Sequence, residues 1–186
     1  MNHLPASRTL YPHTDCPTWP PLRINVEVAA ATGCELLIRY RLNVDPSRIR
    51  LPVGAAPGRA DGLWRHTCFE AFIAGEDFPC YREFNFSPDG HWQAYAFVAY
   101  RDGGAMAAAA TPAISCTAQT DGLELEARLP GALLPAGRRL RLGLSAVIED
   151  VDGLLSYWAL AHAPGKPDFH HPDTFALDFH LPPPYA

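Results

Sequence analysis

Prolines and glycines divide this chain into short segments, with 19 prolines and 14 glycines among 186 residues. This content is high, but 48% of the residues are hydrophobic and 11% are aromatic, which argues against disorder. Turn sequences that contain glycine recur between segments of alternating polarity, at Pro88-Asp89-Gly90, Asp102-Gly103-Gly104, Asp121-Gly122 and Asp152-Gly153. Such turns join neighbouring antiparallel strands. The chain is therefore expected to be an all-β protein.

Ten segments between these turns are predicted to be strands. The clearest is 35–44, where Leu36, Ile38 and Tyr40 alternate with polar side chains, as in a strand with one buried face. The ten predicted strands are 25–29, 35–44, 66–74, 81–87, 91–100, 114–119, 123–129, 140–149, 154–162 and 174–181. About ten strands with frequent turns predict an antiparallel β-sandwich of the immunoglobulin-like or jelly-roll type.

The chain is predicted to form one domain. Residues 1–23 contain five prolines and are expected to be an irregular N-terminal lead-in, followed by a single domain over residues 24–186. Nothing in the sequence resembles an internal linker or a repeat. A chain of this length can bury a sizeable core without a metal or disulfide.

Charge and composition exclude several classes of partner. The formal net charge is −5, so a broad nucleic-acid surface is not expected. No apolar run reaches the roughly 18 residues of a membrane span, and the N-terminal residues lack a signal-peptide core, so a cytoplasmic protein without a membrane partner is expected. The five cysteines are widely spaced, which favours reduced thiols over a structural zinc site.

The turn at Pro88-Asp89-Gly90 also predicts the register of its hairpin. A three-residue loop with glycine in the left-handed position places Ser87 opposite His91. The pairs then run outward as Phe86 with Trp92, Asn85 with Gln93, Phe84 with Ala94, and Glu83 with Tyr95. Because paired residues share a face, one face is apolar and the other is mixed. Hydrophobic pattern and turn chemistry agree on this register.

The mixed face is the first candidate site. With the preceding strand it combines carboxylates and amides with aromatic rings, and Trp64 comes just before that strand. A partly covered face of this kind suits a small polar ligand, whereas the alternative is the solvated outer face of an antiparallel sheet. The candidate ligand-binding residues are Trp64, Glu70, Tyr81, Glu83, Asn85, Gln93 and Tyr95.

A proline-bounded loop near the C-terminus is the second candidate site. It gathers His162, Lys166, Asp168, His170 and His171, and it contains the only lysine of the chain. Histidine and carboxylate together can bind a metal or transfer protons. Two adjacent histidines point to opposite sides of an extended chain, however, and no metal-binding spacing is present, so no metal ligand is assigned. The alternative is a structural loop whose side chains bind backbone groups.

Motifs of known enzyme classes are missing from the sequence. It contains no G-x-S-x-G, no P-loop and no dinucleotide-binding fingerprint. No catalytic residue or cofactor is therefore assigned, and a binding protein is favoured over an enzyme.

Two stretches resemble the DOMON-like domains, in particular an uncharacterised bacterial subgroup. They are residues 63–73, with Trp64 ahead of Cys68-Phe69-Glu70, and residues 81–95, with the Pro88-Asp89-Gly90 turn. Residues 157–160 and 166–170 look like a second signature of that subgroup, and the whole is distantly similar to family 9 carbohydrate-binding modules. The resemblance implies a β-sandwich with a ligand-binding face for sugars or haem.

The resemblance also implies roles for individual residues. In sugar-binding relatives a tryptophan stacks on the sugar, and Trp64 and Glu70 match the tryptophan and the carboxylate of that site. Haem-binding relatives use a methionine and a histidine, and this chain has only Met1 and Met106. The main hypothesis is therefore a non-catalytic module for a small polar ligand such as a saccharide. The alternatives are a metal- or His/Asp-dependent enzyme that uses residues 162–171, a haem protein, and a homodimerisation module.

Overall fold

The protein is an antiparallel β-sandwich without α-helices among the residues that the structure describes. This structure is a computed structural model, and it describes residues 5–16, 21–31, 34–54, 56–107 and 109–183. The strands are β1 (Ala6–Pro12), β2 (Arg23–Ala31), β3 (Glu35–Asn43), β4 (Cys68–Ala74), β5 (Tyr81–Phe86), β6 (Trp92–Ala99), β7 (Asp102–Ala105), β8 (Ala113–Gln119), β9 (Gly122–Leu129), β10 (Arg139–Glu149), β11 (Leu155–Ala159) and β12 (Leu177–His180). The predicted fold class is confirmed.

Short 3-10 turns join some of these strands. They are η1 (Pro46–Arg48), η2 (Leu63–Arg65), η3 (Gly131–Leu133) and η4 (Pro172–Thr174). No helix within the described ranges has the length and apolar character needed to cross a bilayer.

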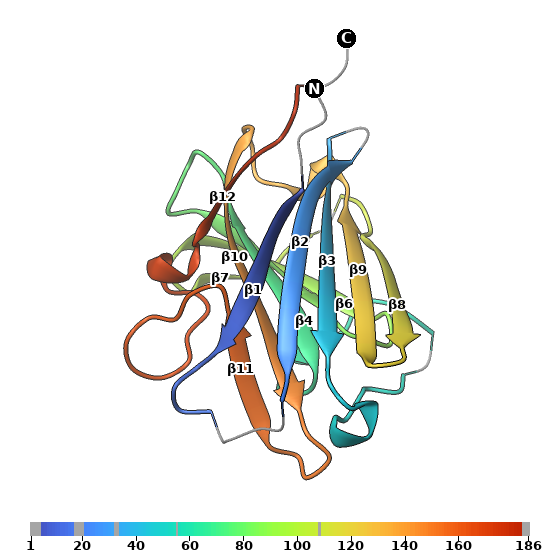
Figure 1. The fold of residues 1–186 in the computed structure, drawn as a ribbon. Coiled ribbons are helices and arrows are strands. Elements are labelled where there is room, and N and C mark those ends of the chain that lie inside the picture. The colour runs from blue at the N-terminus through green and yellow to red at the C-terminus, as the bar shows by residue number, and fades with distance from the viewer. Residues whose placement is uncertain (1–4, 17–20, 32–33, 55, 108, 184–186) are drawn as a thin grey trace.

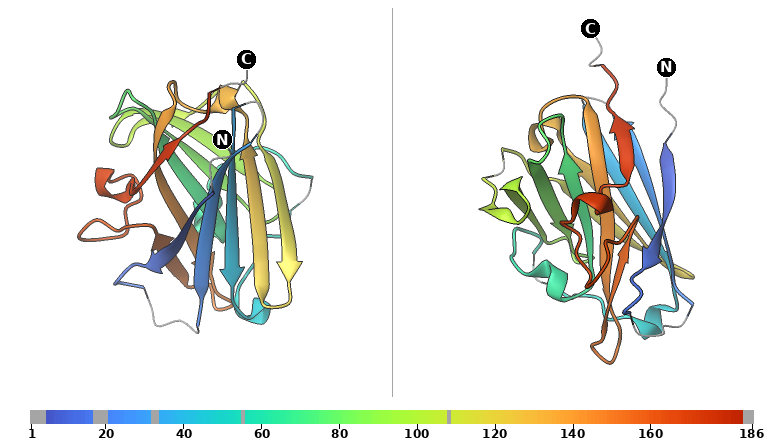
Figure 2. Two further views of the ribbon diagram at one scale, coloured as in Figure 1. Left: turned by 45° about the horizontal axis from the view of Figure 1, so that its top comes forward. Right: turned by 90° about the vertical axis from the view of Figure 1, so that its left-hand side faces the viewer.

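The strands form two layers, which Figures 1 and 2 show from three directions. Sheet A has the order β1-β2-β3-β9-β8, and sheet B has the order β7-β6-β5-β4-β10-β11, with β12 also paired to β10. Strand β1 belongs to both layers, because it pairs with β2 along most of its length and with β11 at Tyr11 and Pro12. The two sheets are thus joined along one edge.

Two observed strands were not expected from the sequence. Residues 1–23 contain β1, so the expectation of an irregular lead-in is wrong for Ala6–Pro12. The prolines lie at or beyond the ends of this strand, and its Leu10 is buried in the core. Strand β7 is four exposed residues at the sheet edge, including Gly103 and Gly104, and has no alternation that could predict it. The strand count is therefore twelve instead of about ten.

The hairpin between β5 and β6 has the register that its turn predicts. The amide of Ser87 donates to the carbonyl of His91 at 2.8 Å, and Gly90 is left-handed with φ 89°. All four predicted pairs occur, from Phe86 with Trp92 to Glu83 with Tyr95. Strand β4 continues the pattern, with Glu70 opposite Asn85. The turn therefore determines which side chains of sheet B face outward.

The main core fills the space between the layers. Sheet A contributes Ile24, Val26, Leu36, Ile38 and Tyr40, and sheet B contributes Phe69, Ile73, Phe84, Phe86 and Trp92. One polar contact crosses this core: the hydroxyl of Tyr40 donates to the carbonyl oxygen of Glu70 at 2.7 Å. It ties the centre of sheet A to the strand that carries a candidate ligand-binding residue.

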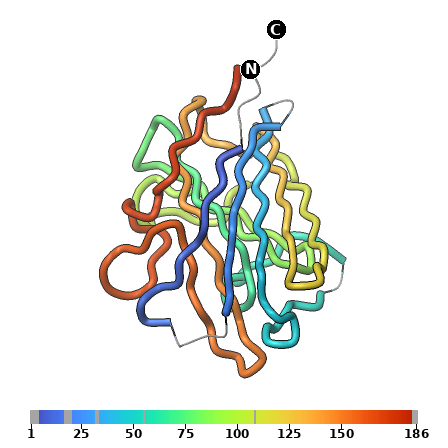
Figure 3. Tube along the Cα trace, viewed as in Figure 1, coloured from blue at the N-terminus to red at the C-terminus, as the bar shows by residue number. Residues whose placement is uncertain are grey.

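The outer faces of the two sheets differ in chemistry. On sheet A, Arg39 forms ion pairs with Glu27, Glu124 and Glu126, as expected for a solvated face. On sheet B, a second apolar cluster forms around Phe72, and residues of the long loop between β11 and β12 cover it. Figure 3 shows this loop projecting beside β11. The outer face of sheet B is thus partly covered by this loop, and a binding site can form where the loop ends.

Replacing Tyr40 with phenylalanine should destabilise the protein by about 1–2 kcal/mol, because the buried carbonyl of Glu70 loses a hydrogen-bond donor. Denaturant unfolding monitored by circular dichroism measures this. Tyr11→Phe is the control, because Tyr11 is exposed on β1. An equal midpoint for Tyr40→Phe and the original protein would contradict the role of this contact.

Candidate ligand-binding site

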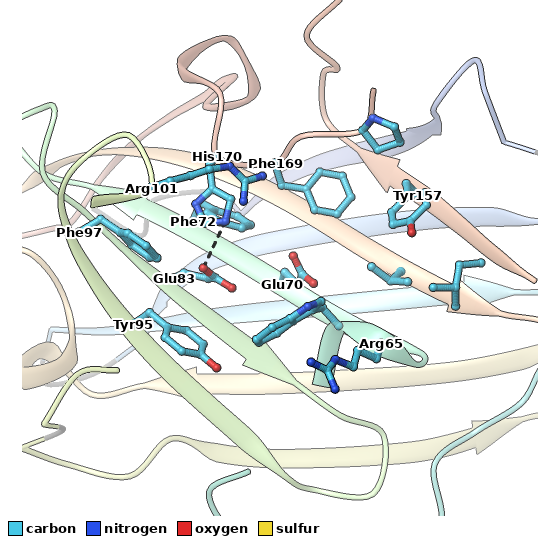
Figure 4. A pocket seen from close by; sticks show the side chains of 14 residues that line it. Arg65, Glu70, Phe72, Glu83, Tyr95, Phe97, Arg101, Tyr157, Phe169 and His170 are labelled. Carbon is cyan, nitrogen blue, oxygen red and sulfur yellow. Dashed lines mark ion pairs between the residues drawn. The ribbon is translucent and has the colours of Figure 1, made fainter. Parts of the chain in front are cut away.

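A cleft of about 550 Å³ opens on the outer face of sheet B. Its floor consists of side chains from β4, β5, β6 and β10, and its walls come from η2, from the first half of β11 and from Pro167, Phe169 and His170. Figure 4 shows Glu70 and Glu83 at the centre, with Phe72 and His170 on one side and Tyr95 on the other. Phe169 and Tyr157 lie toward the far end of the same view. The cleft is therefore aromatic at its sides and acidic at its floor.

The strand register brings the two floor carboxyls together. Glu70 lies opposite Asn85, which is two residues from Glu83 on the same face, so the two glutamates are diagonal neighbours. Their exposed fractions are only 3% and 6%. Asn85 Nδ2 donates to Glu83 Oε1 at 2.8 Å, whereas Glu70 Oε1 is buried without a protein partner. A buried carboxyl oxygen normally requires a hydrogen-bond donor.

Further polar atoms at this floor also lack protein partners. Ser145 lies opposite Glu70 on β10, and its Oγ is buried with no hydrogen bond. The Oδ1 of Asn85 is also buried and has no hydrogen-bond partner. One row across sheet B therefore holds Ser145, Glu70 and Asn85, and each has an unsatisfied oxygen.

Burial changes the acidity of both glutamates. Burial raises the pKa of Glu70 well above its usual range, and the neighbouring Glu83 raises it further. Burial also raises the pKa of Glu83 to about 7, although the hydrogen bond from Asn85 and the charge of Arg101 act in the opposite direction. Two adjacent carboxylates in an apolar setting resist ionising together. Both shifts therefore favour the protonated forms of the floor carboxyls near neutral pH.

His170 faces Glu83 as a neutral ring. The backbone amide of Arg101 donates to the Tyr81 hydroxyl oxygen at 3.1 Å, and the same hydroxyl forms a hydrogen bond of 2.8 Å with His170 Nδ1. The other ring nitrogen of His170, Nε2, lies 3.7 Å from Glu83 Oε2. Burial lowers the pKa of His170 to about 4, so the ring carries no charge at neutral pH.

Aromatic rings form the walls of the cleft. Trp64 is 40% exposed at the rim and meets Tyr95 edge-on, with 5.9 Å between ring centroids. At the far end Tyr157 and Phe169 lie 6.2 Å apart at 58°. Flat ligand surfaces can pack on such rings.

Gln93 holds the loop that carries Trp64. Its Oε1 accepts from Arg59 Nε at 3.0 Å, and its Nε2 donates to Asp61 Oδ1 at 2.9 Å. The Tyr95 hydroxyl donates to the same Asp61 oxygen at 2.8 Å. Gln93 does not line the cleft, and its polar atoms serve the residues just before η2.

Asp168 holds the opposite wall. Its Oδ1 accepts from Arg101 Nη2 at 2.7 Å and from the His170 amide at 3.1 Å, and its Oδ2 accepts from the Tyr100 hydroxyl. The loop between β11 and β12 is thereby fastened to the β6–β7 turn. This places His170 and Phe169 in the wall.

The other loop candidates lie elsewhere. His162 Nε2 contacts the carbonyl of Tyr11 at 2.8 Å, His171 accepts the Asp173 amide at the start of η4, and Lys166 is exposed outside the cleft. No group of three His, Cys, Asp or Glu side chains within the described ranges is placed to hold a metal ion. Met106 packs against the main core.

The cleft thus brings together Trp64, Glu70, Glu83, Tyr95 and His170 from the two predicted sets. Asn85 and Tyr81 support it from beneath through their hydrogen bonds. The prediction of site residues missed Arg65, Arg101, Tyr157 and Phe169. Tyr157 faces outward by simple alternation along β11, which could have indicated it, whereas nothing local marks Arg101.

Comparison with protein-family models and with curated proteins finds no match, so the DOMON-like assignment stays a prediction. Solved structures do share the fold. A protein from Bacteroides uniformis, provisionally named as carbohydrate-binding, aligns with TM-score 0.67 and 16% identity over 91% of this chain and 83% of its own.

Two structures of family 9 carbohydrate-binding modules from Caldicellulosiruptor kristjanssonii also align, each at 8% identity. The complex with glucose has TM-score 0.62 over 89% of this chain and 79% of its own, and the complex with cellotriose has 0.56 over 80% and 70%. The similarity at these identities establishes a common fold.

The original protein should lose stability as the pH rises and Glu83 ionises, and Glu83→Gln should not show this loss. Because the folded pKa of about 7 exceeds the ordinary 4.5, the unfolded chain ionises first, and the unfolding free energy falls between these pH values. We expect Glu83→Gln to match the original protein at pH 4 and to exceed it by roughly 1–3 kcal/mol at pH 8. Denaturant unfolding from pH 4 to 8 measures this.

Glu126→Gln serves as the matched control for this experiment. Arg39 lowers the pKa of Glu126, so its neutral variant should gain no stability at pH 8. A Glu83→Gln protein that is no more stable than the original at pH 8 would show that the pKa of the Glu83 carboxyl is not raised in the folded protein.

Proposed function

We propose that this protein is a non-catalytic binding module and that the cleft on sheet B holds a saccharide. The observation that carries the proposal is the pairing of aromatic walls with two buried floor carboxyls, one of which has a buried oxygen without a protein partner. Sugars present C–H faces that pack on aromatic rings and hydroxyls that donate to carboxyl groups. The cleft contains both the aromatic rings and the carboxyl groups that these contacts require.

The size of the cleft supports a small ligand. Its volume of about 550 Å³ lies within the roughly 300–1,000 Å³ of small-molecule sites. Trp64 at the rim is positioned to pack on one face of a sugar ring, and Glu70 and Glu83 at the floor to bind its hydroxyls. Asp61 and Asp168 hold the two walls by hydrogen bonds, so little ordering is required on binding.

The comparisons support the same proposal at the level of the fold. Two of the similar structures are complexes of family 9 modules with glucose and cellotriose. A DOMON-like affiliation is part of this proposal, supported by residues 63–73 and 81–95, which form the Trp64 wall and most of the floor.

The arrangement of the carboxyls favours binding over hydrolysis. Glycosidases place two carboxyl groups on either side of the bond that they cleave. Glu70 and Glu83 instead lie side by side on neighbouring strands and approach a ligand from the same side. We expect cellotriose to be recovered intact after prolonged incubation with the protein.

Trp64→Ala should weaken saccharide binding at least tenfold, because it removes the exposed ring at the rim of the cleft. Calorimetric titration of the original protein with glucose, cellotriose and other mono- and oligosaccharides comes first. The best ligand is then titrated into Trp64→Ala and into Tyr11→Ala, which removes an exposed ring of β1 that lies outside the cleft and should leave the affinity unchanged.

Two results would contradict the proposal. One is the absence of binding by the original protein across the saccharide panel. The other is an equal loss of affinity in Tyr11→Ala and Trp64→Ala, which would place the ligand outside the cleft.

A further inference from the structure

We propose that the saccharide held in this cleft carries a protonated amine, which sits over Glu70 and Glu83 between the aromatic walls. This inference rests on the proposed function and specifies its ligand class as an amino sugar. It follows from the charge balance of the cleft, from the hydrogen-bonding capacity of its floor, and from the rings that surround it.

The floor carboxyls have no cationic partner in the described part of the chain. Neither Glu70 nor Glu83 forms an ion pair with an arginine or lysine there, and the nearest basic nitrogen to Glu83 belongs to the neutral His170, at 3.7 Å. Arg101 lines the cleft, but its Nη2 is bound to Asp168 at 2.7 Å. Buried carboxylates are normally paired.

The other titratable groups that line the cleft do not supply a cationic partner for Glu70 or Glu83. Arg65 is exposed in η2, where water screens its charge. The hydroxyls of Tyr81 and Tyr95 are committed to His170 and Asp61. The local charge at the floor therefore comes from the two glutamates, and the charge of Arg101, which lowers the pKa of Glu83, acts on it from the wall.

An ammonium group fits the free hydrogen-bonding positions better than a hydroxyl. It offers three donors and a positive charge, whereas a hydroxyl offers one donor and no charge. Glu70 Oε1 is unpartnered, and Glu83 Oε2 has only the long contact to His170. A single cation above two diagonal neighbours can bind both and remove the repulsion between them.

The rings around the floor favour a cation as well. Phe72, Tyr95 and Phe97 line the cleft beside Glu83, and Trp64 stands at the rim. The faces of aromatic rings attract ammonium groups, most strongly where water is excluded. An uncharged hydroxyl gains nothing comparable from them.

Binding of an amine should also release protons. Burial raises the pKa of both carboxyls and so favours their protonated forms near neutral pH. An ammonium ion stabilises the ionised forms, so its binding expels a proton from the floor. A neutral sugar has no such effect, which gives a second readout independent of affinity.

A matched series of trisaccharides tests the inference. Cellotriose, the N-acetylglucosamine trimer and the glucosamine trimer share the linkage and differ at carbon 2, which carries a hydroxyl, an acetamide or an ammonium group. Calorimetry at pH 6.5 and low salt is expected to show the glucosamine trimer binding at least tenfold more tightly than cellotriose. Its apparent enthalpy should change with the ionisation enthalpy of the buffer, and that of cellotriose should not.

Substitutions at the floor assign the preference to its carboxyls. In Glu70→Gln and in Glu83→Gln the ratio of the affinity for the glucosamine trimer to the affinity for cellotriose should fall below about threefold. Glu76→Gln, the same substitution at an exposed position outside the cleft, should keep the full preference. Thermal unfolding of each variant confirms that it is folded.

The outcomes separate this inference from the proposed function. If cellotriose binds and the glucosamine trimer binds no more tightly, the inference fails and the proposed function stands. If neither Gln variant reduces the preference, the ammonium group lies elsewhere and the inference also fails. If none of the three trisaccharides binds, the proposed function fails together with it.

Discussion

The site depends on the antiparallel register of β4, β5 and β6. This register places Glu70 of β4 opposite Asn85 of β5. Glu83 is also on β5, two residues from Asn85, so the two carboxyls share the outer face of one sheet. The same alternation turns Phe69, Phe84 and Phe86 into the core, where their burial stabilises the sandwich. A slip of one residue would exchange the two faces and place carboxyls among the core rings. Core stability therefore preserves the geometry of the cleft.

The walls depend on polar contacts outside the core. Asp61 joins Gln93 and Tyr95 to the loop that presents Trp64, and Asp168 joins the opposite loop to Arg101 and Tyr100. These contacts are at or near the surface, so each is worth less than the burial of a core ring. Core burial thus holds the floor in place, whereas weaker surface contacts hold the walls, so a single substitution can displace a wall more easily than the floor.

The sequence predicts the floor better than the walls. The Pro88-Asp89-Gly90 turn and the alternation around it are local, and both fold class and hairpin register follow from them. The approach of Phe169 and His170 to β5 depends on Asp168 reaching Arg101 from 67 residues away, and no local pattern encodes that contact. Strand β1 was missed because its prolines obscured a short run with a single core residue, Leu10.

The central claim is that two carboxyls, buried side by side in an aromatic cleft, form the ligand site. Carboxyl carbon resonances of glutamate, followed by NMR against pH, test it most directly. The account predicts that Glu83 titrates near pH 7 in the free protein and that a bound saccharide shifts its midpoint. Midpoints near 4.5 for both Glu70 and Glu83, unchanged by any saccharide, would contradict it.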